Sequence, residues 1–290
     1  MQWWCAAQSS AWTWSWQAYP GVWLFILAIG LAYWRRSRRW SRAGGADGDP
    51  AAASPTAGTG LPPRGRPAWF VAGLLCLWAA LDWPIGALGA GYLAGVHMLQ
   101  FVLIALVSPA LLLLGIPPGR PDLGRRTAMA LKVGSQPLIA LILFNLIIIV
   151  THLPAVVDSL MVSQFGSFAI DVLWLAGGIL FWWPVVLDRP ARPYFGYPMK
   201  IGYLILATIV NAGTFLYLTF SELPVYATYE LAPPVYGLSA RDDQRIAGIL
   251  MKVGTVAVLW TAISVLFYRW YRRESVEAQT TAGGGSDDAP

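Results

Sequence analysis

The chain has 290 residues, of which 57% are hydrophobic and only 12% are charged, whereas soluble domains carry about 25% charged residues. Its formal net charge is +5, but the basic residues lie in short segments between long apolar runs, which indicates membrane orientation rather than nucleic-acid binding. This composition predicts an all-α, polytopic membrane protein in contact with lipid, and the only two cysteines, Cys5 and Cys76, exclude a CxxC pair or a structural zinc site.

Seven mostly apolar stretches have roughly the 20 residues needed to cross a bilayer. In chain order they cover residues 16–34, 68–86, 92–115, 133–150, 165–187, 201–220 and 246–270. We therefore predict seven transmembrane helices in a membrane domain over 16–270, preceded by an extracytoplasmic segment, 1–15, without a cleaved signal peptide. The Gly-, Ala- and Pro-rich loop 41–66 and the tail 271–290 are expected to be disordered.

The basic residues predict the orientation of these helices. With seven spans, 17 of the 20 Lys and Arg fall on one side, in segments 35–66, 120–132, 189–200 and 269–273. The positive-inside rule makes that side cytoplasmic, so the N-terminus is expected outside and the C-terminus inside. The chain is therefore expected to be a multi-pass protein.

Polar and sulfur-containing side chains are concentrated in the outer half of the predicted spans, judged at about 1.5 Å of depth per residue. Both histidines, the membrane-embedded carboxylates and two methionines share this half, and the cytoplasmic half has almost no such groups. We list them as candidate metal ligands: His97, Met98, His152, Asp171, Asp243 and Met251.

Each candidate also has a purely structural interpretation. His97 could hydrogen-bond across helices, and His152, beside Leu-Pro at a helix end, could be a solvated interfacial residue. Asp243 could cap the seventh helix, and the two methionines could fill gaps in the packing. Asp171 is harder to explain in this way, because a carboxylate buried in a span costs several kcal/mol unless it is paired or protonated.

Imidazole and thioether groups facing the outer side suit copper, since both are good ligands for Cu(I). Two histidines are too few for the four axial ligands of most two-haem membrane cytochromes, so no haem is expected. No nucleophile–base arrangement, phosphate loop or HExxH motif occurs, and we expect the protein not to be an enzyme.

Four motifs appear in a characteristic order: HMLQFVLIALVSPALLLLGIPPG at 97–119, THLPAVVDSLM at 151–161, GGILFWWPVV at 177–186 and DDQRIAGILMK at 242–252. Together they resemble the seven-span CtaG family of cytochrome c oxidase assembly proteins, which is distinct from the single-span copper chaperone of the same name. The resemblance extends from the second span to the seventh.

The resemblance implies a role in forming haem–copper cytochrome c oxidase, through copper delivery or insertion at the outer face, with oxidase subunits as partners. The family-like positions are His97, Met98, Gln100, His152, Asp243, Gln244, Gly248 and Met251. Phe101 and Asp171 stand where the family usually has histidines, so the chain lacks two potential ligands. The alternatives are a stably bound accessory subunit of the oxidase without a metal site and, third, a small-molecule transporter.

Overall fold

The computed structural model describes residues 2–44, 67–116, 133–187, 195–210 and 212–283. All regular structure within these ranges is helical, which confirms the predicted all-α class. The helices are α1 (Pro20–Gly44), α2 (Pro67–Leu81), α3 (Ile85–Gly91), α4 (Ala94–Phe101), α5 (Ser108–Leu114), α7 (Pro137–Thr151), α8 (Pro154–Leu160), α9 (Gln164–Val186), α10 (Tyr197–Val210), α11 (Ala212–Phe220), α12 (Ala227–Glu230) and α13 (Ala240–Gly283), with a π-helical segment, η2 (Val102–Val107), between α4 and α5.

Four of the described helices are long and apolar enough to cross a membrane, and six if two bent helix pairs each count as one span. The four are Ala94–Leu114, Gln164–Val186, Tyr197–Phe220 and Ala240–Glu277. The pair α2–α3 bends by 45° and the pair α7–α8 by 69°. The predicted first span falls on α1, whose apolar stretch ends at Trp34 before Arg35 and Arg36. The protein is therefore a multi-pass membrane protein.

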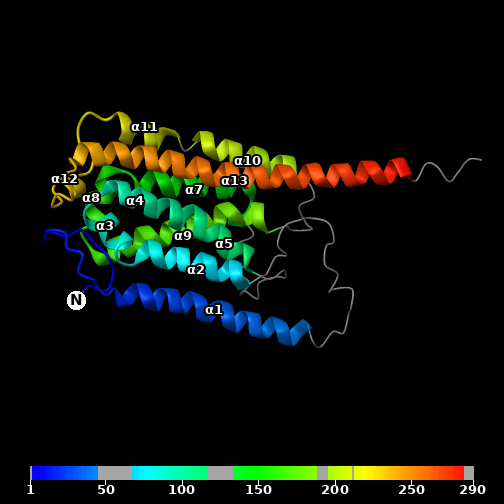
Figure 1. The fold of residues 1–290 in the computed structure, drawn as a ribbon, viewed down its shortest axis with the longest axis horizontal. Coiled ribbons are helices and arrows are strands. Elements are labelled where there is room, and N and C mark those ends of the chain that lie inside the picture. Colours follow the sequence, from blue (N-terminus) through cyan, green and yellow to red (C-terminus); the bar gives the residue numbers. More distant parts are fainter. Residues whose placement is uncertain (1, 45–66, 117–132, 188–194, 211, 284–290) are drawn as a thin grey trace, which may run out of the picture.

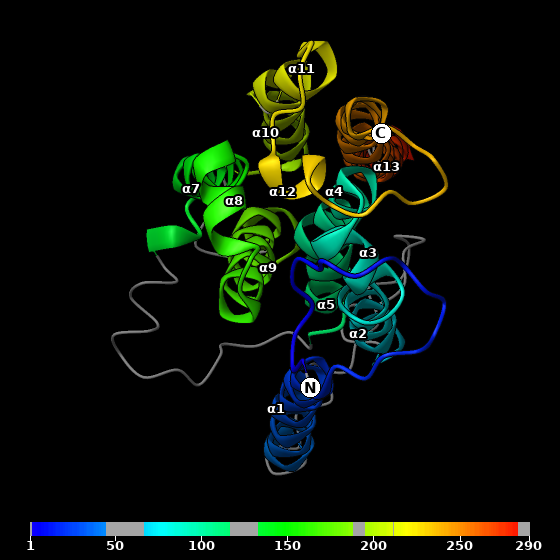
Figure 2. The ribbon, with the colours of Figure 1, turned by 90° about the vertical axis from the view of Figure 1, so that its left-hand side faces the viewer.

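The continuous helix α4–η2–α5 lies at the centre of the bundle, where it contacts α2, α9 and α13 (Figures 1 and 2). In this central span 67% of the most apolar window is buried, against 25% for α10–α11 and 28% for α13. The two peripheral spans thus expose most of their apolar surface, which suits contact with lipid.

Pro109 explains why the central helix contains a π-helical segment. Its ring has no N–H and clashes with the carbonyl of the residue four positions earlier, Ala105, so the regular α-helical ladder cannot continue there. A Cβ on Gly178 of α9 would collide with that same carbonyl. The glycine therefore lets α9 approach the centre of the bundle closely.

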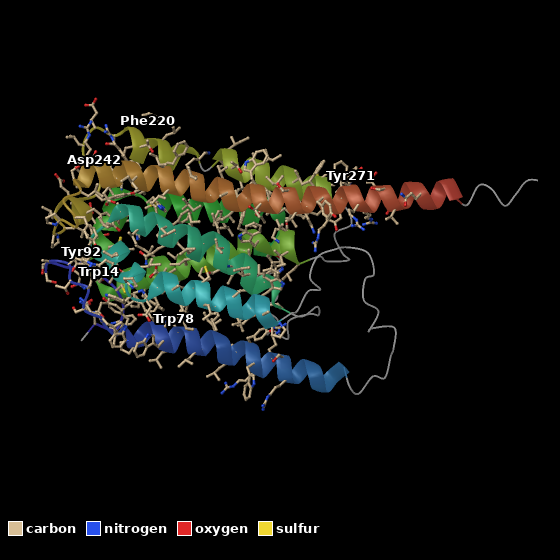
Figure 3. The ribbon with its side chains drawn as sticks, in the orientation of Figure 1. Trp14, Trp78, Tyr92, Phe220, Asp242 and Tyr271 are labelled. Atoms are coloured by element: carbon tan, nitrogen blue, oxygen red, sulfur yellow. The ribbon has the colours of Figure 1, made fainter. Side chains whose placement is uncertain are left out.

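The bends, the short helices α3, α8 and α12, and the N-terminus all lie at one end of the bundle (Figure 1). Trp14, Tyr92 and Asp242 mark this end and Tyr271 the opposite one (Figure 3). The N-terminal segment, residues 2–19, has no helix and crosses the end of the bundle beside α9 (Figure 2). We call this end the N-terminal end.

The structure differs from the predicted disorder at two places. Helix α1 continues through 41–44, and α13 continues from 271 to Gly283. Exposed pairs spaced by four residues support this last part of α13, since Trp270 donates to Glu274 at 3.0 Å and Arg273 to Glu277 at 2.9 Å. The rest of the loop, 45–66, and of the tail, 284–290, lies outside the described residues.

Candidate functional site

The two histidines meet at a single tryptophan near the N-terminal end of the bundle. The His97 ring lies 4.9 Å from the Trp174 ring, and the His152 ring lies 5.6 Å from it in a stacked arrangement. Phe101 completes the group, 5.3 Å from both His152 and Trp174. We call these four residues the histidine cluster; all four are buried.

His152 owes its position to the Leu-Pro sequence that follows it. Proline disfavours helical backbone in the residue before it, and Leu153 is accordingly extended, with φ −67° and ψ 133°. Helix α7 therefore ends at Thr151, and His152 is its C-cap residue. The predicted helix end is confirmed, but the side chain is buried rather than solvated.

The hydrogen bond of His152 identifies its tautomer. Its Nδ1 lies 2.8 Å from the carbonyl oxygen of Ile148. A carbonyl can only accept, so Nδ1 carries the proton and Nε2 has the free lone pair. No described residue is within hydrogen-bonding distance of this buried Nε2. Metal-binding histidines are usually prepared in this way, with one nitrogen bonded to a carbonyl and the other free.

His97 enters the cluster from α4. Its ring packs against Trp174 and lies 5.9 Å from Tyr229 in α12. The buried Nε2 of His97 likewise has no hydrogen-bond partner among the described residues. Trp174 is held in place by the bond that its indole N–H donates to Thr151 Oγ1 at 2.9 Å. The cluster thus presents two buried imidazoles around a fixed aromatic ring.

Asp243 caps another helix. Its two carboxylate oxygens accept hydrogen bonds from the backbone N–H of Ala94, at 2.6 Å, and of Gly95, at 3.0 Å. These are the first two residues of α4, where free N–H groups and the helix dipole favour an anion. A Cβ on Gly95 would stand 2.9 Å from Asp243 Oδ1, so glycine permits this close contact. The N-cap role is observed, but on α4 rather than on the seventh helix, because the tertiary packing brings the N-terminus of α4 against Asp243.

The two predicted methionines, Met98 and Met251, belong to the two helices that this cap joins, α4 and α13. In the central helix, Gly95 faces Asp243 of α13, and Val102 faces Gly254 of α13. Met98 follows Gly95 by three residues and precedes Val102 by four, so it lies on the same face of the central helix. Met251 shares the face of Asp243 on α13 in the same way. Both methionines are buried, with 1% of their surface exposed. They therefore lie at the interface of α4 and α13, on a different face of α4 from His97.

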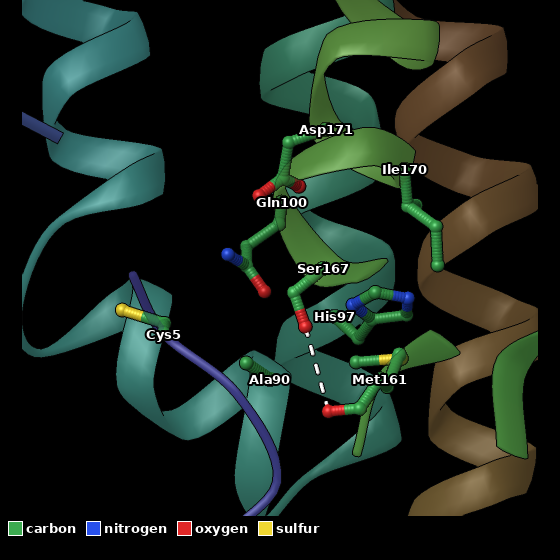
Figure 4. A pocket seen from close by; sticks show the side chains of 8 residues that line it. All are labelled: Cys5, Ala90, His97, Gln100, Met161, Ser167, Ile170 and Asp171. Atoms are coloured by element: carbon green, nitrogen blue, oxygen red, sulfur yellow. Dashed lines mark hydrogen bonds between the residues drawn. The ribbon is translucent and has the colours of Figure 1, made fainter. Parts of the chain in front are cut away.

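A small pocket lies next to the histidine cluster (Figure 4). His97, Met161, Ser167 and Asp171 line it, together with Cys5, Ala90, Gln100 and Ile170. Figure 4 shows the thioether of Met161 beside the His97 ring. Tyr229 donates its O–H to the Gly89 carbonyl at 2.7 Å, and the same phenolic oxygen lies 3.6 Å from Met161 Sδ. Met161 thus adds a soft sulfur donor at the side of His97.

Asp171 is at the wall of this pocket, where its Oδ2 accepts a hydrogen bond of 2.8 Å from the indole of Trp4. The six predicted metal-binding residues therefore form two groups: His97, His152 and Asp171 lie around α9, whereas Asp243, Met98 and Met251 lie between α4 and α13. Within the described ranges, no three histidine, cysteine or acidic side chains form a group that could hold a metal ion. Metal binding by these residues stays a prediction.

Sequence reasoning missed three contributors to the site. Met161 ends the second motif, and that position was the only signal for it. Trp174 and Trp4 had no signal at all, since a tryptophan in or near an apolar span is most often part of the packing.

Comparison with known proteins confirms the resemblance. A family model described as cytochrome c oxidase caa3 assembly factor (Caa3_CtaG) matches residues 31–273. No curated protein and no solved structure matches the chain. The matched region contains the whole histidine cluster and both groups of predicted ligands, but it begins after the N-terminal segment.

Proposed function

Because the chain belongs to the Caa3_CtaG family of cytochrome c oxidase caa3 assembly factors, we propose that it holds Cu(I) in the histidine cluster during assembly of a haem–copper oxidase. The copper is cargo, to be passed on to an oxidase subunit. The protein acts in this proposal as a carrier and has no catalytic activity of its own.

One observation carries the proposal: two buried imidazoles contact the same indole, and each keeps an unpaired Nε2. A buried polar atom without a partner costs about 1–3 kcal/mol, so two such atoms on rings that contact the same indole call for an explanation. A bound cation supplies one, since it would take both lone pairs. Imidazole and thioether are ligands that suit Cu(I), and Met161 supplies the thioether beside His97.

The orientation in the membrane belongs to the same proposal. The histidine cluster is near the N-terminal end of the bundle, and Arg35, Arg36, Arg269 and Arg272 belong to the distal parts of α1 and α13. We place the N-terminal end outside and the arginines in the cytoplasm, in accordance with the positive-inside rule. This arrangement needs seven spans, with α1 and both bent pairs each crossing a bacterial cytoplasmic membrane once.

The test is a Cu(I) titration of the purified protein under reducing, anaerobic conditions, against a chromogenic chelator. We expect about one tightly bound Cu(I) per chain, and at least a tenfold weaker affinity in His97→Ala and in His152→Ala, because each removes a metal bond worth more than about 1.4 kcal/mol. Unchanged affinity in both variants would show that the histidines do not hold the metal.

The thioether is tested with volume-conserving variants. Met161→Leu keeps the packing volume and removes the sulfur, so we expect weaker Cu(I) binding with little loss of stability. Met199→Leu is the matched control, because Met199 lies in α10 and is 56% exposed. Equal affinities of the two variants would exclude Met161 as a ligand.

The alternative of an accessory subunit without a metal site has its own support. Asp243 is committed to the cap of α4 and Asp171 to Trp4, so neither carboxylate is a free ligand. An accessory subunit would co-purify with the mature oxidase at fixed stoichiometry, whereas an assembly factor would be absent from the mature complex. Oxidase activity and copper content in a deletion strain test the broader role.

A further inference from the structure

The N-terminal segment closes the pocket beside His97 from the outside of the bundle. Hydrogen bonds attach residues 3–7 to the bundle, and Gly21 of α1 donates its backbone N–H to the Trp3 carbonyl at 2.9 Å. The Gln164 side-chain oxygen accepts the backbone N–H of Trp3 at 2.7 Å and of Trp4 at 3.3 Å. Trp4 donates its indole N–H to Asp171, and the backbone N–H of Ala7 donates to the Met161 carbonyl at 2.9 Å. Two of these partners, Asp171 and Met161, also line the pocket.

Side chains of the segment complete the closure. Trp4 is 1% exposed and packs edge-on against Phe168, with ring centres 4.9 Å apart. Cys5 is 3% exposed, lines the pocket, and donates its thiol to the carbonyl of Leu81 at 3.4 Å. A segment with neither helix nor strand thus buries two side chains at the mouth of the site.

The attachment is nevertheless of a kind that can be released. The segment has no secondary structure of its own, and only a few hydrogen bonds hold its backbone to the bundle. Segments with few backbone bonds at a chain terminus open locally at much lower free energy than the core. The segment also lies outside the region that the family model matches, residues 31–273.

We propose that residues 2–10 form a lid over the pocket, and that His97 becomes accessible from water only when this lid lifts. The Trp4 indole is the latch: it supplies the hydrogen bond to the buried Asp171 carboxylate while the lid is shut. A cation entering the pocket offers the same carboxylate a positive charge in place of the indole N–H. That the entering cation is Cu(I) rests on the proposed function, whereas the existence of the lid does not depend on it.

The test uses Cys5 as a reporter of opening, in a Cys76→Ala background where it is the only thiol. The measured quantity is the rate of alkylation by a small, water-soluble maleimide in detergent, without copper. We expect Trp4→Phe, which keeps an aromatic ring and loses the N–H, to label about tenfold faster or more, the change expected from losing one charge-assisted hydrogen bond. Gln164→Ala should label faster for the same reason, since it loses two backbone bonds.

The matched control is Trp12→Phe on the same segment, because the indole N–H of Trp12 is buried but has no hydrogen-bond partner among the described residues. The labelling rate of the Trp12→Phe variant should equal that of the Cys76→Ala parent protein. Unchanged rates in both Trp4→Phe and Gln164→Ala would overturn the lid, and so would an equal increase in the control, since it would indicate general loosening.

The rate of Cu(I) uptake then separates the lid from the proposed function. Faster uptake by Trp4→Phe, in parallel with faster labelling, supports the lid as the entrance. Faster labelling with unchanged uptake would overturn its role as the entrance. A protein that binds no Cu(I) at all would refute the proposed function, while the labelling rates would still decide whether the lid exists.

Discussion

The cap formed by Asp243 leads to a quantitative prediction about how the site is held. Asp243→Ala leaves the N–H groups of Ala94 and Gly95 buried without acceptors. Each such group costs roughly 1–3 kcal/mol, so the variant should lose about 2–6 kcal/mol of stability, and Asp243→Asn, which keeps one acceptor, about half of that. Thermal unfolding in detergent, followed by tryptophan fluorescence, should show a Tm lower by roughly 5 °C or more for the alanine variant.

The control is the neighbouring Asp242→Asn. Asp242 is exposed and bonds to nearby Ser239, so its replacement should change stability by less than about 0.5 kcal/mol. Because α4 carries His97, we also expect Asp243→Asn to weaken Cu(I) binding in proportion to its loss of stability. An Asp243→Asn protein as stable as the control but unable to bind copper would refute this reasoning, since the carboxylate would then be a ligand and not a cap.

Three further predictions concern packing, the cluster and the lid. Gly178→Ala drives a methyl group into the central helix and should lower the free energy of unfolding by about 1–3 kcal/mol. The control is Gly202→Ala, because nothing lies within 4 Å of a Cβ placed there; this variant should be neutral or more stable by about 0.5–1 kcal/mol. Equal melting temperatures of the Gly178→Ala and Gly202→Ala variants would contradict the close contact at Gly178. Thr151→Val removes the acceptor of the cluster's indole and should cost about 1–3 kcal/mol, again measured by Tm, with unchanged stability as the contrary result. Burial first, and then the negative charge of Asp171, raise the pKa of the Cys5 thiol. Its alkylation should therefore need a higher pH than that of a free thiol, and the pH–rate profile should move to lower pH in lid-opening variants; a profile independent of the lid would contradict this cause.

The sequence was sufficient for the elements whose signal is local. Long apolar runs predicted the ends of the central helix and of α9 to within two residues. In lipid the backbone N–H and C=O groups of such a run have no water to bond, so they must form hydrogen bonds with one another in a helix. The Leu-Pro pair predicted that α7 ends at His152, which is its C-cap residue, because proline acts on the residue immediately before it. The order of four motifs was enough to recognise the family, which the family model confirms.

The sequence was misleading where a local pattern had a distant partner. The acidic pair before the last helix predicts a cap on that helix, but Asp243 caps α4 across 149 residues. The sequence also could not identify the residue that pairs with Asp171, which is Trp4, 167 residues away; metal binding by Asp171 stays a prediction. A carboxylate accepts a hydrogen bond from whichever N–H the fold brings within reach. Helical periodicity within one span does not predict which distant donor that will be.

Residue types and their depth alone thus determined that this is a helical membrane protein with imidazole and sulfur groups in one half of its spans. Only the tertiary structure decided which of them meet: His97 and His152 at Trp174, with Met161 added and Met98 and Met251 turned to another interface. The physical reason is that the depth of a residue follows from its position along its own helix. The direction in which its side chain points depends on how that helix is rotated against its neighbours. That rotation is set by close contacts such as those at Gly95 and Gly178, which belong to no single helix.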